Sequence, residues 1–531
     1  MPTKVSRRQL IRACKGRGWM VQGPALVAMH EFFNLQDSVA LDTVLDALAK
    51  RLDRSTTVVT ESLWNGLMEE TDETDDAVPL DNDRSSSDVL QVVNAFDGPK
   101  LVYDTTRRAF RIDEKPISLL GSAQDKIKMM AQRYAFVHQR LLRHQAKKEF
   151  QLTPIESLLG RQSTGHEEPV LVMGILTQAS EGKFKLEDST GEVEVSFHNA
   201  TLVESCFVTE NSILLVEGTF VNGSDILEAH RVGSPPFLEE RESCLNLLKK
   251  QVRHAHFQPS TTNNDFSLVV LSDVHLDQPS VLASLENLFQ TVQEKHDQST
   301  DEPLVFCLMG NFASSPYADN QQGWQDLAKL IEKFKFLANQ AHFVVVPGPN
   351  DTTISILPLT PISYESTVPA KSMQSIRNVH WGSNPCRLRL EGKEIVLFNY
   401  DVLSSMLQNA IQLPEENSIT TPRSRMLKTI LDQGHLLPVA KSPIYWNCDH
   451  ALRIWPPPDM IVLGGSSAAP ESQLYAGCDA VHLGSFSRKG SCSYYTPRPE
   501  FNDDDDHELE DGTSRFEFLE ALPAELKAKK M

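Results

Sequence analysis

Side chains that can ligate metal ions or transfer protons occur at regular places in the C-terminal half of the chain. Asp273 and His275 follow the apolar run 266–271, and Asn311 follows the run 304–308. Short apolar runs are typical of buried strands, and open α/β sheets bind ligands at their strand ends. Further groups occur downstream, and they are Asn350 with Asp351, His435, and Gly465 with Ser467.

The order and spacing of these groups resemble the calcineurin-like metallophosphoesterases, whose motifs are DxH, GD, GNH(D/E), GH and GHxH. In that family the motifs hold two metal ions roughly 4 Å apart, which activate a water and clamp a phosphate. Asp273 and His275 match the first motif, and His435 matches the fourth. Asn311 stands where the family has the aspartate that bridges both metals, and a neutral amide is a poor bridge between two cations.

The third and fifth motifs depart further from the family pattern. Pro349 and Asn350 replace the ligating asparagine and the catalytic histidine, so that only Asp351 remains of the third motif. Gly465 and Ser467 replace both histidines of the fifth. Two divalent ions without these ligands would repel each other strongly in a site of low dielectric. We therefore expect no catalytic residue, no cofactor and no metal, with the remaining polar side chains held by hydrogen bonds at strand ends.

Two alternatives retain a reactive site. A reduced site would support an active metal-dependent phosphoesterase or exonuclease, whose turnover Asp273→Ala and His435→Ala would abolish. A single weakly bound metal on Asp273, His275 and His435 is the second alternative.

Composition and periodicity divide the chain into seven segments. The predicted segments are a helical docking domain at 1–70, an acidic linker at 71–88, a connecting segment with a basic helix at 89–160, an OB-fold at 161–240, a linker at 241–265, an inactive calcineurin-like phosphoesterase domain at 266–497 and an acidic tail at 498–531. The basic helix is expected over 123–146, either with a solvated face or as a patch against an acidic partner.

Residues 168–233 alternate in the manner of strands. The runs 213–221 and 226–232 flank Asn222 and Gly223, which is a strong hairpin signal. Five short strands with a helix in the middle, beginning after residue 197, predict an oligonucleotide/oligosaccharide-binding (OB) barrel. Beyond residue 265, strand–helix alternation predicts an α/β domain. The fold class is therefore multidomain α+β, with an N-terminal helical domain, an OB-fold β-barrel and a calcineurin-like α/β sandwich.

The buried strands and the helices of the α/β domain are predicted from apolar runs and amphipathic stretches. The strands are expected at 266–271, 304–308, 343–346, 394–398, 460–463 and 480–483, and the helices at 280–295, 322–338 and 421–432.

This combination resembles the B-subunits of replicative DNA polymerases, and the chain is identified as a member of that family, in its epsilon branch. The resemblance covers most of the chain apart from the acidic linker and the tail. The tethered N-terminal helices favour the epsilon branch over the delta branch, and His275 departs from a tryptophan expected there. The matching strings are KFKLEDSTG at 183–191, MGNFASSPY at 309–317, FVVVPGPND at 343–351, TILDQGHLLP at 429–438 and PIYWNCDHALR at 443–453.

The resemblance implies a non-catalytic accessory subunit of the nucleus, acting in leading-strand DNA replication and origin firing. The OB-fold and the phosphoesterase-like domain would hold the C-terminal zinc domain of the catalytic subunit of DNA polymerase epsilon. The N-terminal domain would dock on GINS in the CMG helicase, and small histone-fold subunits would share the holoenzyme. DNA contact would be mainly indirect. A B-subunit of another replicative polymerase is the remaining family alternative.

Composition and charge agree with a protein-binding role. Of 531 residues, 40% are hydrophobic, which excludes a wholly disordered chain, and the formal net charge is −20. Residues 168–233 hold eleven acidic and three basic residues, whereas a single-stranded DNA groove needs a positive track with stacking aromatics. The four phenylalanines there are expected in the core, and they are Phe184, Phe197, Phe207 and Phe220.

Localisation signals are few. No apolar run approaches the roughly 18 residues that a membrane span needs, so no membrane association is expected. No secretory signal is visible, and the eight scattered cysteines form no CxxC pair, which indicates reduced thiols.

Overall fold

The computed structural model describes most of the chain from residue 89 onward and a few positions before it. The described residues are 15, 20–21, 25–26, 29–30, 58–59, 89–145, 151–159, 169–203, 205–221, 225–237, 239–252, 265–295, 302–415, 420–440, 442–466, 468–495 and 516–520. The chain forms two compact units, Met1–Arg84 and Ser85–Met531. In the first, strands β1 (Met20–Val21) and β2 (Val58–Val59) pair in parallel. The helical domain predicted at 1–70 and the linker at 71–88 lie almost entirely outside the described residues.

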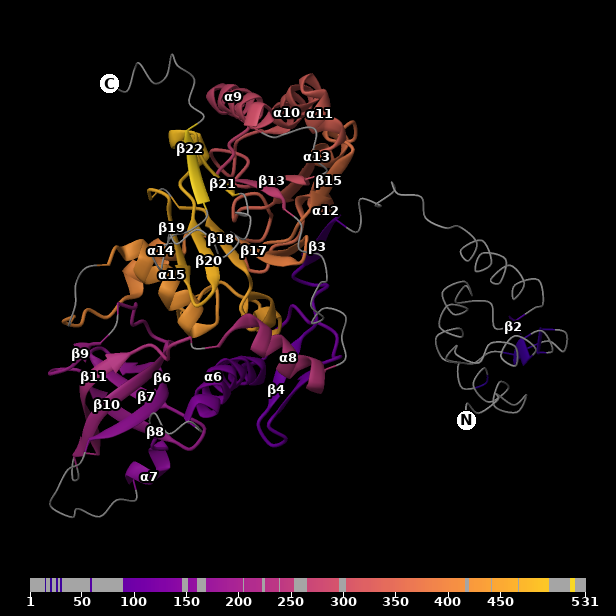
Figure 1. Cartoon of the computed structure of the whole chain (residues 1–531). Coiled ribbons are helices and arrows are strands. Elements are labelled where there is room, and N and C mark those ends of the chain that lie inside the picture. The colour runs from indigo at the N-terminus through magenta and orange to yellow at the C-terminus, as the bar shows by residue number, and fades with distance from the viewer. Residues whose placement is uncertain are drawn as a thin grey trace, which may run out of the picture. The chain divides into compact units, whose positions relative to one another are not determined.

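Six strands of the second unit close into an OB barrel, as predicted (Figure 1). Antiparallel pairing of β10 with β11 closes the barrel. Side chains of a strand point alternately to its two faces, so Leu214, Val216 and Phe220 of β10 are buried in the barrel interior. The strands are β6 (Val170–Ser180), β7 (Lys183–Glu187), β8 (Glu192–Ser196), β9 (Thr201–Leu202), β10 (Ile213–Val221) and β11 (Ile226–Gly233).

The helix predicted after residue 197 is wrong, because the described residues between β8 and β10 form no helix. Strand β9 pairs in parallel with β11 instead. The Leu202 N–H donates to the Pro414 carbonyl at 2.7 Å, and the Ile411 N–H donates to the Val208 carbonyl at 2.8 Å. An extended backbone leaves its polar groups free for such pairing, whereas a helix would use them internally.

Two six-stranded sheets form the α/β domain (Figure 1). The first sheet runs β15 (Asn378–Trp381), β14 (His342–Val346), β13 (Leu304–Met309), β12 (Ser267–Leu271), β21 (Ser491–Tyr495) and β22 (Phe516–Glu520). The second runs β19 (Glu471–Tyr475), β20 (Cys478–His482), β18 (Met460–Gly464), β17 (Lys393–Asn399), β16 (Cys386–Leu390) and β3 (Leu90–Asn94). The six predicted strands are confirmed, whereas the edge strands of both sheets and the antiparallel strands β16 and β21 escaped prediction.

The sheets pack face to face, and helices cover their outer faces. Val270, Val344 and Leu397 lie in the core between the sheets. The first sheet is covered by α9 (Pro279–Lys295), α10 (Gln321–Lys333) and α11 (Lys335–Asn339), and the second by α14 (Val402–Asn409) and α15 (Pro422–Gln433). Shorter helices are α12 (Ile362–Glu365), α13 (Thr367–Ser372), α16 (Phe486–Lys489) and the 3₁₀ helix η2 (Trp446–Leu452).

The predicted basic helix is α6 (Ala123–Gln145), and it begins with a capping box. The Ser122 N–H donates to Asp125 Oδ2 at 2.8 Å, and the Asp125 N–H donates to Ser122 Oγ at 3.3 Å. The prediction of a solvated basic face is wrong for two of the basic residues of this helix, because Arg133 and Arg140 are buried. Neighbouring elements are a hairpin of β4 (Leu101–Asp104) and β5 (Ala109–Ile112), α7 (Ile155–Leu159) and α8 (Arg241–Gln251).

Three further findings bear on the sequence predictions. Strand β22, in the predicted acidic tail, folds back and pairs with β21, which extends the first sheet. The seven cysteines within the described ranges are all free thiols. Among the helices that the structure describes, none is both long enough and apolar enough to cross a membrane.

Candidate functional site

Neighbouring strand ends bring five predicted positions into one cluster. Asp273 follows β12, Asn311 follows β13, and the loop holding Asn350 and Asp351 follows β14. Asn311 Nδ2 lies 3.5 Å from Asp273 Oδ1, and the Asn350 N–H donates to Asn311 Oδ1 at 2.9 Å. The His275 backbone N–H donates to the Asp273 carbonyl at 3.0 Å. The first sheet therefore assembles the remnants of the first three motifs.

The second sheet contributes a glycine and an asparagine to the same place. Asn399, the last residue of β17, donates its side-chain N–H to the Gly310 carbonyl next to Asn311. The Gly465 N–H, after β18, donates to Ser272 Oγ at 2.7 Å. A Cβ at Gly465 would lie 2.8 Å from Asn399 Oδ1, and its φ of 81° favours glycine. The predicted position Ser467 lies outside the described residues.

Asp351 joins two loops with its carboxylate. Oδ1 accepts the Phe312 N–H at 2.8 Å, and Oδ2 accepts the Gly348 N–H at 2.7 Å. The fit is so close that a Cβ at Gly310 would lie 1.8 Å from Asp351 Oδ2. Each oxygen of this acid is therefore already used by backbone of the same cluster.

Burial disfavours simultaneous ionisation of Asp273, His275 and Asp351. Burial raises the pKa of Asp351 to about 7, and the charge of Asp273 adds to the rise. Burial also raises the pKa of Asp273, although His275 opposes that shift. Burial lowers the pKa of His275 in turn. Burial penalises an ionised carboxylate that has no counter-charge beside it. Within the ranges that the structure describes, no group of three or more His, Cys, Asp or Glu side chains is placed to hold a metal ion.

His435, the remaining predicted position, lies in a different environment. It is buried directly after the glycine that ends α15, Gly434, which adopts a left-handed φ of 62°. His435 Nδ1 accepts the Leu437 N–H at 3.0 Å, so the neutral ring carries its hydrogen on Nε2. Nε2 lies 3.1 Å from Asp449 Oδ1 and donates to it. Both ring nitrogens are therefore occupied by protein groups.

Asp449 is the centre of a buried ion network that joins α6 to η2. Arg133 of α6 approaches Asp449 Oδ1 through Nε at 2.8 Å and Nη2 at 2.6 Å. Arg453 Nε approaches Asp449 Oδ2 at 3.0 Å. Despite burial, Arg133 and His435 hold the pKa of Asp449 well below its usual range. Burial, with the charge of Arg133, lowers the pKa of His435 to about 4, so this ring is neutral at physiological pH.

The end of α15 also joins the α/β domain to the barrel. Gln433 pairs with the backbone of Ile213 on β10, since its Oε1 accepts the N–H at 2.8 Å and its Nε2 donates to the carbonyl at 2.8 Å. Thr429 Oγ1 accepts the Phe207 N–H at 2.9 Å. The helix is fixed at its start as well, where the Thr421 side chain accepts an N–H from the first turn. The string that carries the fourth motif therefore forms an interdomain joint.

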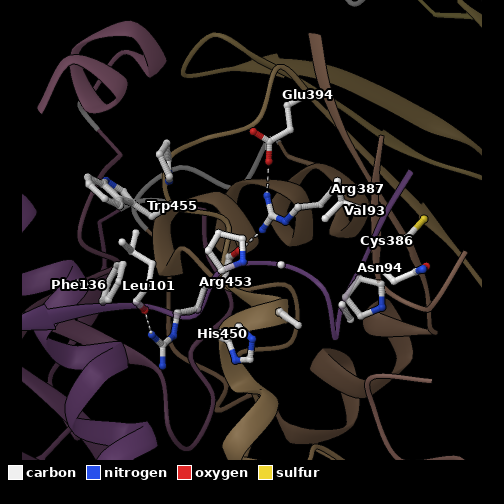
Figure 2. A pocket seen from close by; sticks show the side chains of 16 residues that line it. Val93, Asn94, Leu101, Phe136, Cys386, Arg387, Glu394, His450, Arg453 and Trp455 are labelled. Carbon is white, nitrogen blue, oxygen red and sulfur yellow. Dashed lines mark hydrogen bonds and ion pairs between the residues drawn. The ribbon is translucent and has the colours of Figure 1, made fainter. Parts of the chain in front are cut away.

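A cavity of about 60 Å³ lies beside the ion network (Figure 2). Phe136 and Trp455 form an apolar wall, and Arg387 pairs with Glu394 at 2.5 Å on another side. Both ring nitrogens of His450 are buried beside this cavity. This volume suits a few waters and is far below that of small-molecule pockets, which hold roughly 300–1,000 Å³.

Sequence reasoning did not find Asn399, Arg133 or Asp449. Asn399 directly follows the correctly predicted strand 394–398, and strand ends are where ligand-binding side chains are expected. Its position in the sequence could therefore have identified it. Arg133 and Asp449 are separated by 316 residues, and a local pattern cannot pair them. Asp449 and Arg453 stand in the string PIYWNCDHALR, which marked the family but not their bond.

Comparisons with known proteins agree with this architecture. Residues 268–471 match the family of the B-subunit of DNA polymerases alpha and epsilon. Residues 123–236 match the OB-fold domain described as DNA polymerase epsilon subunit 2-like. The barrel joined to a two-sheet α/β domain therefore places the chain in the class of polymerase B-subunits.

Full-length relatives narrow the class. DNA polymerase epsilon subunit 2 of Bos taurus and that of Homo sapiens are each 30% identical to the chain, over 91% of it and 95% of theirs. The DNA polymerase epsilon B-subunit of Arabidopsis thaliana is 30% identical, over 93% of this chain and 98% of that protein. The chain belongs to the DNA polymerase epsilon subunit 2 family, a family of accessory subunits in DNA replication. A chain from the S. pombe Stn1-ten1 crystal structure is also similar, at 12% identity over 19% of this chain and 92% of that chain. Its TM-score of 0.14 is too low to indicate a shared overall fold.

Proposed function

We propose that the protein is a non-catalytic subunit that scaffolds the catalytic subunit of DNA polymerase epsilon. The observation that carries this proposal is the buried joint between Gln433 and Ile213, which fixes the barrel to the α/β domain. Two domains joined in this way present one continuous surface, on which the C-terminal zinc domain of the catalytic subunit would bind. Small histone-fold subunits would complete the same holoenzyme in the nucleus.

Co-expression of the full chain with the catalytic subunit tests this role. We expect a stable complex that survives size-exclusion chromatography. Recovery of the chain as a free monomer would contradict the proposal. Binding instead to the catalytic subunit of another replicative polymerase would favour the alternative B-subunit assignment.

The α/β domain is, in this proposal, a degenerate calcineurin-like phosphoesterase, and the eight motif positions are remnants. Support comes from Asn311 at the bridging position, from the backbone N–H groups on Asp351, and from the engagement of both nitrogens of His435. Hydrolysis of a phosphodiester and of single-stranded DNA should stay at background with Mn²⁺, Mg²⁺ or Zn²⁺. Metal-dependent turnover that vanishes in Asp273→Ala would establish the active alternative, and Asp326→Ala serves as the surface control.

We further propose that residues 1–70 dock on GINS in the CMG helicase, with the linker at 71–88 as a flexible tether. Support comes from the separation of Met1–Arg84 as a compact unit of its own. This link would connect the polymerase to leading-strand synthesis and origin firing. A pull-down with and without residues 1–70 tests it, because truncation should remove helicase components and keep the polymerase subunits.

Direct DNA binding by the barrel is not part of the proposal. Phe207 and Phe220 are buried, and Phe184 packs against Phe197 at 5.7 Å between ring centroids while contacting the barrel core. These rings are therefore poorly placed to stack on bases. The segment boundaries at 161–240, 241–265, 266–497 and 498–531 stay predictions that limited proteolysis would test, although α8 lies within the predicted linker and β22 within the predicted tail.

A further inference from the structure

A groove of about 1280 Å³ runs along α6. In Figure 1, α6 lies between the barrel and the pair formed by the β4–β5 hairpin and α8. One wall includes Tyr103, Phe110 and Leu247 from the hairpin and α8, and the opposite wall includes Glu187 and Asp188 from the barrel. The helix therefore forms the floor of a trough with two walls.

The floor is apolar and partly exposed to solvent. Ile127 is 61% exposed and Leu142 is 43% exposed, although both belong to a helix whose other face is packed. Ala131 lies between them on the same floor, and its small side chain permits close approach of another backbone. At a rise of 1.5 Å per residue, the two exposed ends lie about 22 Å apart, which matches a helix of about four turns.

The rims of the groove carry opposite charges. Arg108 and Lys126 line it near the hairpin turn and the start of α6. Lys126 Nζ also lies 5.9 Å from the centroid of the Trp446 ring. Glu187 and Asp188 provide the negative charge of the barrel side. A ligand with acidic residues on one flank and basic residues on the other would complement both rims.

Hydrogen bonding within the walls favours a helix over a strand as the ligand. Gln132 occupies both backbone groups of Tyr103, accepting its N–H at 2.9 Å and donating to its carbonyl at 3.0 Å. Gln251 accepts the Phe110 N–H at 2.8 Å. A strand binds by adding to a free sheet edge, and these side chains occupy the edge groups of the hairpin. A helix satisfies its own backbone and needs only an apolar surface.

We propose that this groove binds an amphipathic helix of about four turns from another subunit of the polymerase complex. Its apolar stripe, with anchors at i, i+3 or i+4, and i+7, packs on Ile127 and Leu142. Its acidic flank faces Arg108 and Lys126, and its basic flank faces the barrel. The inference rests on the proposed function, because it takes the ligand from that complex.

Site-specific photo-crosslinking in the reconstituted complex tests the groove. p-Benzoylphenylalanine is placed at position 127, and in a control at position 354, where Ile354 is 56% exposed outside the groove. We expect position 127 to label a helical segment of another subunit that position 354 does not label. Labelling of an extended segment, labelling within this chain alone, or equal labelling from both positions would overturn the proposal.

A second measurement uses substitutions on the exposed floor. Ile127→Asp and Leu142→Asp should each weaken binding of the labelled subunit about tenfold, whereas Ile354→Asp should leave it unchanged. Unfolding curves should show that these variants remain folded, because the replaced side chains are exposed. If the wild-type chain assembles with no polymerase subunit, the proposed function fails. If it assembles and all three variants bind equally, only the groove inference fails.

Discussion

Arg133 of α6 and Asp449 of η2 form a buried ion pair with 2.6 Å between Nη2 and Oδ1. Arg453 and His435 bond to the same carboxylate. Asp449 therefore neutralises two guanidinium groups and orients the His435 ring. The side chains of Arg133 and Asp449 are 7% and 1% exposed, so water cannot replace a lost partner. The pair therefore fixes the helix that precedes the barrel onto the α/β domain.

Removal of the acid should destabilise the protein strongly. Asp449→Ala leaves two buried guanidinium groups without their carboxylate, which costs about 3–5 kcal/mol of unfolding free energy. Denaturant unfolding measures this loss. Asp326→Ala, which removes the exposed pair with Lys329, is the control and should cost under about 1 kcal/mol. Equal effects of the two substitutions would refute a structural role for the network.

The stabilising effect of His435 should depend on pH. Its folded pKa of about 4 lies below the unfolded value of 6.5, so the unfolded state binds more protons between these values. The stability due to the neutral ring is fully present above about pH 6.5 and is lost as the pH falls toward 4. The destabilisation caused by His435→Gln should therefore be largest at neutral pH and shrink on acidification. Unfolding curves from pH 4 to pH 7.5 test this, and a pH-independent difference would contradict it.

Asp351 should show the opposite pH dependence. Its folded pKa of about 7 lies above the ordinary value of 3.8, so the folded state binds the extra proton. The stability due to the neutral acid is present below pH 3.8 and is lost as the pH rises through 7. The cost of Asp351→Asn should therefore be largest in acid and fall toward neutral pH. A cost that grows from acid to neutral pH would show that the carboxylate is ionised in the folded state.

Gln433 should hold the barrel to the α/β domain. Gln433→Leu leaves the N–H and the carbonyl of Ile213 without these partners, and unsatisfied buried groups cost about 1–3 kcal/mol. Hydrogen exchange should show faster exchange of the Ile213 amide. Gln290→Leu, at an exposed position of α9, is the matched control. Unchanged protection of the Ile213 amide would show that Gln433 does not stabilise the joint.

One added methyl group in the strand-end cluster should destabilise the fold. Gly310→Ala would place a Cβ 1.8 Å from Asp351 Oδ2, so the loops must separate and the variant should lose several degrees or more of melting temperature. Gly233→Ala is the control, because no heavy atom lies within 4 Å of its added Cβ. Similar melting temperatures for both variants would show that the cluster is loosely packed.

The sequence predicted the parts of the fold that depend on local patterns. Continuous apolar runs identified the parallel-paired strands β12, β13, β14, β17, β18 and β20, because parallel strands are buried on both faces. The edge strands β3, β15, β19 and β22 and the antiparallel strands β16 and β21 lack such continuous apolar runs and were not predicted. The expected helix after residue 197 failed because long-range pairing with residues 410–415 governs that segment.

The sequence likewise predicted part of the candidate site and misplaced the rest. Strand ends placed Asp273, Asn311 and Asp351 together, as the motif spacing predicts, because neighbouring parallel strands end at one edge. Family motifs placed His435 with them as well, whereas the fold uses that ring to bind Asp449. The partner of a buried side chain is a matter of three-dimensional packing, which motif order does not record.

The sequence by itself determined the family, the barrel and the core strands, because these follow from residue types in local order. Only the tertiary structure decided that the string TILDQGHLLP forms a joint, since Gln433 and Ile213 are 220 residues apart. It also decided that Arg133 and Arg140 face inward, because burial of a charge depends on partners far along the chain. Charge and periodicity describe a helix in isolation, and packing determines which of its faces meets water.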